Sequence, residues 1–231
     1  MSNERRARVL AELAKQGDLD GSRLCDVAGA VVGVTGAGIM IMSSDSPLGS
    51  LCSSNAMSGV IEDLQYALGE GPCVDAYGLD RPVLEPDLAN PATPRWLAFS
   101  RGALEVGARA VFGFPLRFGA ARLGALNLCS DRAGALSDDQ YADALTVADV
   151  AAEAVLVLQA GAPPGQLATA LETDANFQYV VHQAAGMVSV HLSVSIAEAL
   201  VRLRAHAFAT GRPLTDVAAD VVALKLRLAH D

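Results

Sequence analysis

Apolar residues follow helical spacing near the N-terminus and then form short strand-like runs. The helical spacing predicts helices over residues 5–15 and 19–34. The apolar run Ala37–Met42 predicts a buried strand, and residues 50–54 are its expected hairpin partner. Residues 43–49 between them contain Ser, Asp, Pro and Gly, which is typical of a turn.

The middle of the chain alternates between helical and strand-like patterns. We expect a helix over 58–68 that ends at a glycine, a strand over 81–84, and a helix over 95–104. Residues 108–116 and 122–129 have strand character and are separated by a short turn, which predicts an antiparallel pair. This order of elements indicates an α+β fold with an antiparallel sheet.

A long predicted helix follows the sheet. Ser137 and Gln140 have the spacing of a capping box, in which the serine oxygen accepts from a helix amide and the glutamine reaches back. We expect this helix to continue to about Gln159. The next segment, Gly161–Gly165 (GAPPG), is typical of a linker because prolines stop a helix and glycines loosen the chain.

The tail predicts three short amphipathic helices. Apolar stripes at helical spacing begin at Val181, Ile196 and Leu214. A second capping box, Ser195–Glu198, begins the middle helix, and Gly211 is expected to end it. Three apolar stripes on short helices predict one small all-α core.

Charge is spread unevenly over the two predicted domains, residues 1–160 and 170–231, which a linker at 161–169 joins. The 231 residues are 52% apolar and 19% charged, which favours a folded core over disorder. Residues 176–231 hold five Lys/Arg and four Asp/Glu, and the preceding residues hold 12 and 22, so the balances are +1 and −10. The net charge of −9 argues against a protein that coats nucleic acid, but the tail is compatible with a local contact.

The cysteines are widely spaced and form no C-x-x-C pair, which argues against a zinc site. They are Cys25, Cys52, Cys73 and Cys129. We expect free thiols in a reducing cytoplasm. The charged N-terminus lacks a long apolar stretch, so no signal peptide is expected, and the uncharged residues 27–44 are interpreted as a helix end and a strand, not a membrane span.

Signatures of catalysis are missing from the chain. It has no G-x-x-x-x-G-K-[ST], G-x-S-x-G or H-E-x-x-H motif. No histidine precedes His182, so the first domain offers no Cys-His or Ser-His pair. We therefore expect no enzyme, no catalytic residues, and no metal or cofactor.

Three segments of the first domain occur in a characteristic order. LQYALGEGPCVDAYGLDRPVLEPDL, residues 64–88, is followed by RGALEVGARAVFGFPL and RLGALNL. Together they resemble a GAF domain over about residues 19–158. The resemblance implies a six-stranded type of antiparallel sheet backed by helices, a small-ligand pocket, and dimers formed through the terminal helices. The Asn-Lys…Phe…Asp-Glu signature of cyclic-nucleotide GAF domains is missing.

The turn Gly69–Cys73 (GEGPC) is the candidate ligand site of this domain. We expect a helix to begin at Val74, and a helix start presents free amides that bind anions. The alternative is that the glycines and the proline only shape the chain and that the cysteine is a small buried hydrophobe. The candidate ligand residues are Gly71, Cys73 and Asp75.

A set of small and apolar residues, together with one arginine, marks the tail. It comprises Ala184, Gly186, Ala199, Leu203, Arg204, Ala207, Leu214, Val217, Ala218 and Val222. Over about residues 179–228 this combination resembles an ANTAR domain, the RNA-binding module of bacterial transcription antiterminators, and the GAF–ANTAR order resembles an actinobacterial regulator. The resemblance implies that a homodimer binds hairpin loops in nascent RNA. Ala185 and Gln178 stand where this family usually has basic residues.

Seven tail residues are candidate RNA contacts, the arginines because their planar group pairs with phosphate and stacks on bases. They are His182, Gln183, Gly186, Arg202, Arg204, His206 and Arg212. Arg202 also has the spacing of an ion pair with Glu198, and His206 suits a half-buried or solvated imidazole. The patch Ala184–Gly186 suits either the close approach of a base or tight helix packing.

Two other functions stay open. A helical tail with Met187 and Phe208 on its surface suits a ligand sensor or dimeric scaffold that binds a protein partner. A GAF-type methionine sulfoxide reductase that acts through Cys52, Cys73 or Cys129 is a weaker alternative.

Overall fold

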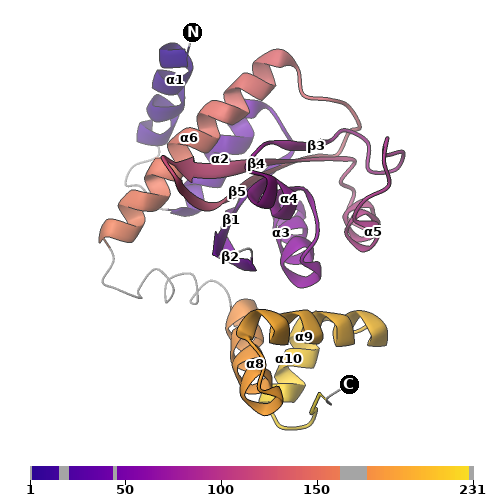
Figure 1. Ribbon diagram of the computed structural model, residues 1–231. Coiled ribbons are helices and arrows are strands. Elements are labelled where there is room, and N and C mark those ends of the chain that lie inside the picture. The colour runs from indigo at the N-terminus through magenta and orange to yellow at the C-terminus, as the bar shows by residue number, and fades with distance from the viewer. Residues whose placement is uncertain (1, 16–20, 44–45, 162–175, 229–231) are drawn as a thin grey trace. The chain divides into compact units, whose positions relative to one another are not determined.

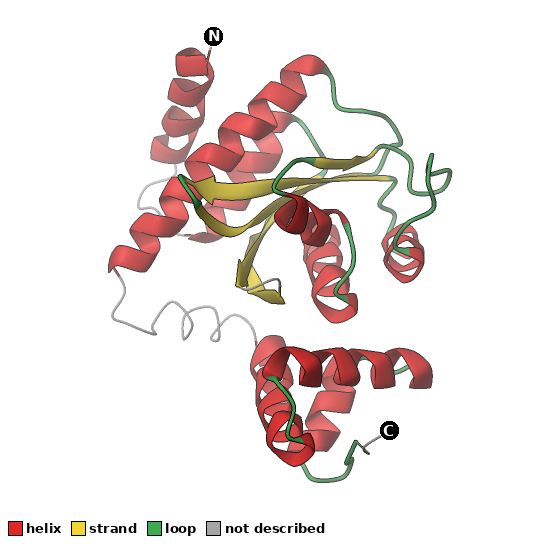
Figure 2. Cartoon of the chain, viewed as in Figure 1, coloured by secondary structure: helices red, strands yellow, loops and turns green. Residues whose placement is uncertain are grey.

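The computed structural model describes residues 2–15, 21–43, 46–161 and 176–228. The chain divides into two compact units, Met1–Leu167 and Ala168–Asp231. The first unit is a sheet covered by helices, and the second is a bundle of helices (Figure 2).

The first unit is built on an antiparallel sheet with strand order β2-β1-β5-β4-β3 (Figure 1). Its strands are β1 Gly36–Ser43, β2 Ser46–Ser53, β3 Val83–Glu85, β4 Ala110–Phe118 and β5 Ala121–Ser130. The predicted antiparallel pairings of β4 with β5 and of β1 with β2 are both confirmed, the second with two register shifts. β2 begins at Ser46, within the segment predicted to be a turn. The GAF resemblance implied six strands, and the sheet has five within the part of the chain that the structure describes.

Helices cover both faces of this sheet. They are α1 Ser2–Lys15, α2 Gly21–Val32, α3 Ala56–Leu68, α4 Pro72–Leu79, α5 Leu97–Glu105 and α6 Asp138–Gly161. Helices α2 and α6 pack on one face of the sheet, and α3 and α4 pack on the other (Figure 1). The expected α+β fold is therefore confirmed.

Residues along each strand alternate between these two faces. Ile39 of β1 lies opposite Cys52 and Leu126, on the face that α2 and α6 cover. The preceding residue, Gly38, lies opposite Asn127 on the face that α3 and α4 cover. Because both faces are covered, the central strands β1, β4 and β5 contain long apolar runs that show little alternation of polar and apolar residues.

Glycines allow α3 and α4 to approach the sheet closely. Asn127 lies between Gly38 and Gly113 in the register of three adjacent strands. A methyl group on Gly38 would lie 2.9 Å from the Glu62 side chain, and one on Gly113 would lie 2.4 Å from the Pro72 carbonyl oxygen. These strand positions must therefore lack a side chain for the two helices to sit where they do.

Local signals for helix ends are confirmed in this unit. Gly69 ends α3 in a left-handed conformation with φ of 65°. Ser137 and Gln140 exchange both hydrogen bonds of the predicted capping box, at 3.2 and 3.0 Å. Trp96 is buried and has a φ of 50°, so it precedes α5 and does not lie within the helix, although the predicted helix over 95–104 included it.

A disulfide joins Cys25 to Cys52, so the expectation of free thiols is wrong for this pair. Cys73 and Cys129 are free and buried. The bonded cysteines are separated by 27 residues and lie in α2 and β2, whose packing brings the two Cα atoms to 5.9 Å. Sequence spacing does not show such proximity because it arises from tertiary packing.

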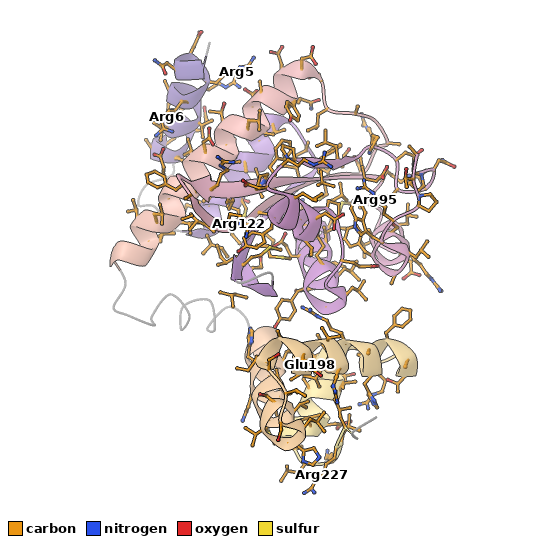
Figure 3. The ribbon with its side chains drawn as sticks, viewed as in Figure 1. Arg5, Arg6, Arg95, Arg122, Glu198 and Arg227 are labelled. Carbon is orange, nitrogen blue, oxygen red and sulfur yellow. A yellow bond between two sulfur atoms is a disulfide. The ribbon has the colours of Figure 1, made fainter. Side chains whose placement is uncertain are left out.

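Ion pairs join α1 to α6. Arg5 binds Asp139 at 2.5 Å and Asp143 at 2.6 Å, and Arg6 binds Glu153 at 2.6 Å (Figure 3). The hydrogen bond that Arg5 donates to the Asp139 carboxylate is the main cause that raises the pKa of Arg5. Because exposed ion pairs are screened, the pairs with Asp139 and Glu153 weaken as salt rises, whereas the pair with the buried Asp143 is screened less.

Within residues 176–228, the second unit contains the three predicted amphipathic helices. They are α8 Asn176–Leu192, α9 Ile196–Thr210 and α10 Leu214–Val222. Their apolar stripes meet in one core, formed by Val181, Ala184, Ala185, Val188, Leu192, Ala199, Leu200, Leu203, Ala207, Leu214, Val217, Ala218 and Val221. The expected all-α fold of the tail is therefore confirmed.

The ends of α9 are capped as the sequence predicts, with one difference. The Ser195 hydroxyl accepts from the Glu198 amide at 3.1 Å, and Gly211 ends the helix with φ of 64°. In the predicted capping box, the Glu198 carboxylate would accept from the Ser195 amide. In the structure it accepts from Arg202 instead, at 2.9 Å.

Among the described residues, no single helix is both long enough and apolar enough to span a membrane. Residues 180–192 and 196–210 pass such a test only as a pair, and a bend of 107° separates them.

The disulfide should stabilise the first unit. Closing a loop of 27 residues restricts the unfolded chain, so Cys25→Ser with Cys52→Ser should lower the free energy of unfolding by about 3–4 kcal/mol. Urea unfolding with and without dithiothreitol measures this difference. Reductant should shift the wild-type midpoint and leave the double variant unchanged, and equal midpoints for wild type in both buffers would contradict the linkage.

Gly113→Ala should destabilise the first unit by roughly 1–3 kcal/mol or more, because the new methyl group meets the backbone of α4. Gly78→Ala is the matched control, since Gly78 also belongs to this region but has open space around it. The control should be neutral or slightly stabilising because alanine favours helix over glycine. Thermal unfolding compares the two, and similar melting temperatures would refute the close approach.

Candidate nucleic-acid interface and ligand site

Three predicted RNA contacts lie on α8. Gln183 is exposed, and His182 and Gly186 are half-buried. Apart from the neighbouring residues and backbone of α8 itself, no atom of the described residues lies within 4 Å of the position that a methyl group on Gly186 would take, so this part of the helix surface is open. Ala184 and Ala185 are fully buried, so these two alanines serve helix packing, whereas Gly186 stays accessible.

The predicted arginines differ in their surroundings. Arg202 forms the i,i+4 ion pair with Glu198 at 2.9 Å, and Arg212 binds Asp220 of α10 at 2.6 Å. Arg204 is half-buried. Two of the three arginines are therefore already neutralised by carboxylates of the same unit.

The predicted residues of α9 do not form one surface. Two residues along a helix are separated by about 200° around its axis, so Arg202 and Arg204 point to different sides. His206 lies four residues after Arg202 and therefore on the same side of the helix. Its side chain is half-buried, which matches the first of the two environments expected for it, a half-buried or a solvated imidazole.

Two basic residues after α10 are not among the predicted RNA contacts. Lys225 and Arg227 are exposed, and neither forms an ion pair with any residue that the structure describes. Arg227 lines a pocket of about 180 Å³ together with Met187 and His191 of α8. In Figure 3 Arg227 lies apart from Glu198 on α9. The sequence Lys-Leu-Arg that contains them follows the last segment with helical spacing of apolar residues, so periodicity does not relate it to the other contacts.

The three candidate ligand residues of the first unit lie at the start of α4. That helix begins at Pro72, two residues before the predicted Val74. Gly71 has a φ of 133°, and a methyl group there would lie 2.6 Å from the Gln65 side chain. The Cys73 amide donates to Gln65 Oε1 at 2.7 Å. One of the free amides that the sequence offered to an anion is therefore occupied by the protein itself.

Asp75 and Cys73 point to different environments. Asp75 accepts a hydrogen bond from Trp96 Nε1 at 3.1 Å, and Arg95 lies 4.3 Å above the Trp96 ring (Figure 3). Cys73 is fully buried, and burial together with the nearby Glu62 raises the pKa of its thiol well above the ordinary value. Burial likewise raises the pKa of Cys129 to about 12. Both thiols therefore stay protonated near neutral pH, which disfavours nucleophilic chemistry.

A buried polar cluster, which we define as Glu62, Gln65 and Asn127, lies between α3 and β5. These side chains are at most 1% exposed. Both carboxylate oxygens of Glu62, Gln65 Nε2 and both amide atoms of Asn127 have no well-formed hydrogen bond. Sequence reasoning missed the cluster, although an asparagine in the middle of the apolar strand β5 is a visible signal.

Burial controls the protonation of this cluster. It raises the pKa of Glu62 to about 8, against smaller lowering by the side chains of Asn127 and Ser50. At neutral pH the carboxyl group is therefore mostly neutral and can both donate and accept a hydrogen bond. The buried polar cluster thus offers donors and acceptors in an apolar layer, where each unmatched group costs free energy.

The first unit has a fold similar to that of a solved GAF domain. The GAF domain of a phosphoenolpyruvate-protein phosphotransferase from Coxiella burnetii is 13% identical, with a TM-score of 0.51, over 69% of this chain and 95% of that one. The corresponding Acinetobacter domain is 12% identical over the same shares, with a TM-score of 0.49. No curated protein matches the chain.

Family models match both units. The GAF domain model matches residues 21–156, and the ANTAR domain model matches residues 165–222. The expectations drawn from the sequence resemblance are confirmed at this level. Because the GAF model covers more than half of the residues, the chain belongs to the GAF domain family, and an ANTAR domain follows its GAF domain.

Proposed function

We propose that this chain is a transcription antitermination regulator whose ANTAR domain binds hairpin loops in nascent RNA. ANTAR domains are RNA-binding antitermination modules, and GAF domains are sensory. The observation that carries the proposal is the ANTAR match, which coincides with a folded three-helix unit. Occupation of a loop disfavours a competing terminator hairpin, so transcription continues.

Local charge supports RNA as the ligand of this unit. The unit carries a small positive balance on an otherwise acidic chain. The pairs Arg202–Glu198 and Arg212–Asp220 are partly exposed, and such pairs contribute at most about 1 kcal/mol. An RNA phosphate can replace these carboxylates because arginine binds phosphate through charge-assisted, often bidentate hydrogen bonds.

The GAF domain is the proposed input and dimerisation part of the chain. A homodimer presents two ANTAR units, and two linked weak contacts bind a two-hairpin RNA far more tightly than one. The buried polar cluster supports a small ligand or a proton as the input, because its unmatched donors and acceptors lie inside the sensory domain.

A protein-binding tail is the second candidate function. Val201 and Phe208 are 59% and 70% exposed, and their spacing of seven residues places them on one side of α9. Exposed apolar residues on one helix face are a common feature of protein-docking helices. This function and RNA binding give opposite results in the following experiment.

Arg202→Ala with Arg204→Ala should weaken binding to a two-hairpin RNA by roughly tenfold or more, since charge-assisted contacts contribute about 1.5–3 kcal/mol each. The slope of log affinity against log salt should fall by about one for each lost phosphate contact. Filter binding of the full chain over a salt series measures both quantities.

Arg101→Ala with Arg132→Ala is the matched control, because it removes equal charge from exposed positions of the GAF domain. Glu198→Gln should bind at least as tightly as wild type, since it frees Arg202 from its partner. If the tail double variant and the control retain RNA equally, RNA binding through α9 is refuted and the protein-binding tail is favoured.

Glu62→Gln should change how stability depends on pH. The folded pKa of about 8 exceeds the ordinary 4.5, so the native state keeps a proton that the unfolded state releases between these values. Stability linked to Glu62 is thus present below the lower value and is lost as pH rises through the higher one, by up to about 1.4 kcal/mol per unit. Urea unfolding at about pH 5 and 8 should show wild type losing stability relative to Glu62→Gln, whereas parallel curves would contradict the buried carboxyl.

A further inference from the structure

The ANTAR unit contains a pocket that lies apart from the predicted arginine contacts of α9. Met187, Val188 and His191 of α8 form one wall, and Val221 with residues of the following segment forms the other. The members of that segment are Leu224, Leu226, Arg227 and Leu228. The walls are mostly apolar, and the volume of about 180 Å³ is smaller than the roughly 300–1,000 Å³ of sites for drug-sized molecules.

Polar groups of this pocket are confined to His191 and Arg227. Both side chains are planar, and planar histidine and arginine groups stack on nucleobases. Lys225 precedes Arg227 by two residues and is also exposed. Among the described residues, Lys225 and Arg227 have no carboxylate partner, unlike Arg202 and Arg212. The pocket therefore combines an apolar interior with a basic rim whose Lys225 and Arg227 form no ion pair within the described part of the chain.

We propose that this pocket receives one unpaired nucleobase of a bound RNA loop while Lys225 and Arg227 bind the adjoining phosphates. The proposal rests on the proposed function and names a second, separate contact for it. Apolar walls suit the faces of a flipped base, and the basic rim suits the backbone on either side of it. An apolar peptide would use the walls but would gain nothing from the two cations, and the volume suits a single ring system.

The backbone after α10 brings the second wall of the pocket into place. Leu224 has a φ of 59°, which is uncommon for a leucine, and the chain turns there immediately after α10. The turn lays Leu226 and Leu228 beside α8 and forms the second wall of the pocket. Leu224 itself remains 65% exposed at the rim.

The test begins with RNA hairpins selected from a pool of randomised loops on the wild-type full chain. Each loop position of the selected RNA is then replaced in turn by an abasic nucleotide, and the affinity is measured. One position should be much more sensitive than the others, with a loss of about 5- to 100-fold for the missing stacked base. Wild type that retains no RNA would refute the proposed function, and this site with it.

Two variants connect that position to the pocket. Met187→Trp fills the cavity, and Arg227→Gln removes a rim charge from an exposed position where folding is not at stake. Both variants should bind the intact RNA more weakly than wild type. For Met187→Trp, the abasic nucleotide at the sensitive loop position should cause no further loss of affinity. Leu97→Trp is the control for bulk, since Leu97 is 78% exposed in the GAF domain. Arg132→Gln is the control for charge.

Selected RNA that binds both pocket variants as tightly as wild type would refute the pocket but leave the proposed function standing. The same conclusion follows if Met187→Trp keeps the full sensitivity to the abasic position. If Met187→Trp changes the oligomeric state in size-exclusion chromatography and leaves RNA affinity intact, a second copy of the chain occupies the pocket and the proposal is wrong.

Discussion

The distance between helices and sheet in the GAF domain is the constraint on which its interior depends. Asn127 has a glycine on either side in the sheet, and these glycines let α3 and α4 pack directly on the strands. The same closeness brings Glu62 against the sheet in a layer that excludes water. A carboxyl group held there is neutral because of its surroundings, and unmatched polar groups in a native core are more typical of functional sites than of stable packing.

Features set by neighbouring residues could be predicted from the sequence. The capping box at Ser137, the glycine end of α3, and the β4–β5 hairpin each depend on a few adjacent positions. Features set by packing could not. The Cys25–Cys52 disulfide and the buried polar cluster join residues of different elements, and no periodic pattern relates such positions.

The candidate RNA site shows the same division. The Arg202–Glu198 pair was weighed from its i,i+4 spacing, whereas the Arg212–Asp220 pair joins the end of α9 to α10 and depends on how the two helices meet. The charges of Lys225 and Arg227 are evident from the sequence, but the position of this segment beside α8 follows from the turn after α10. Residue type was thus predictable for the interface, and the grouping of residues into surfaces was not.

The strand order has a consequence for self-association. β2 and β3 are the outer strands, and an outer strand with free backbone groups is a template on which another chain can continue the sheet. β2 is irregular, with two register shifts against β1, and β3 has only three residues. Neither edge offers the long, flat ladder that such a continuation needs, so the strand order disfavours association by extension of the sheet.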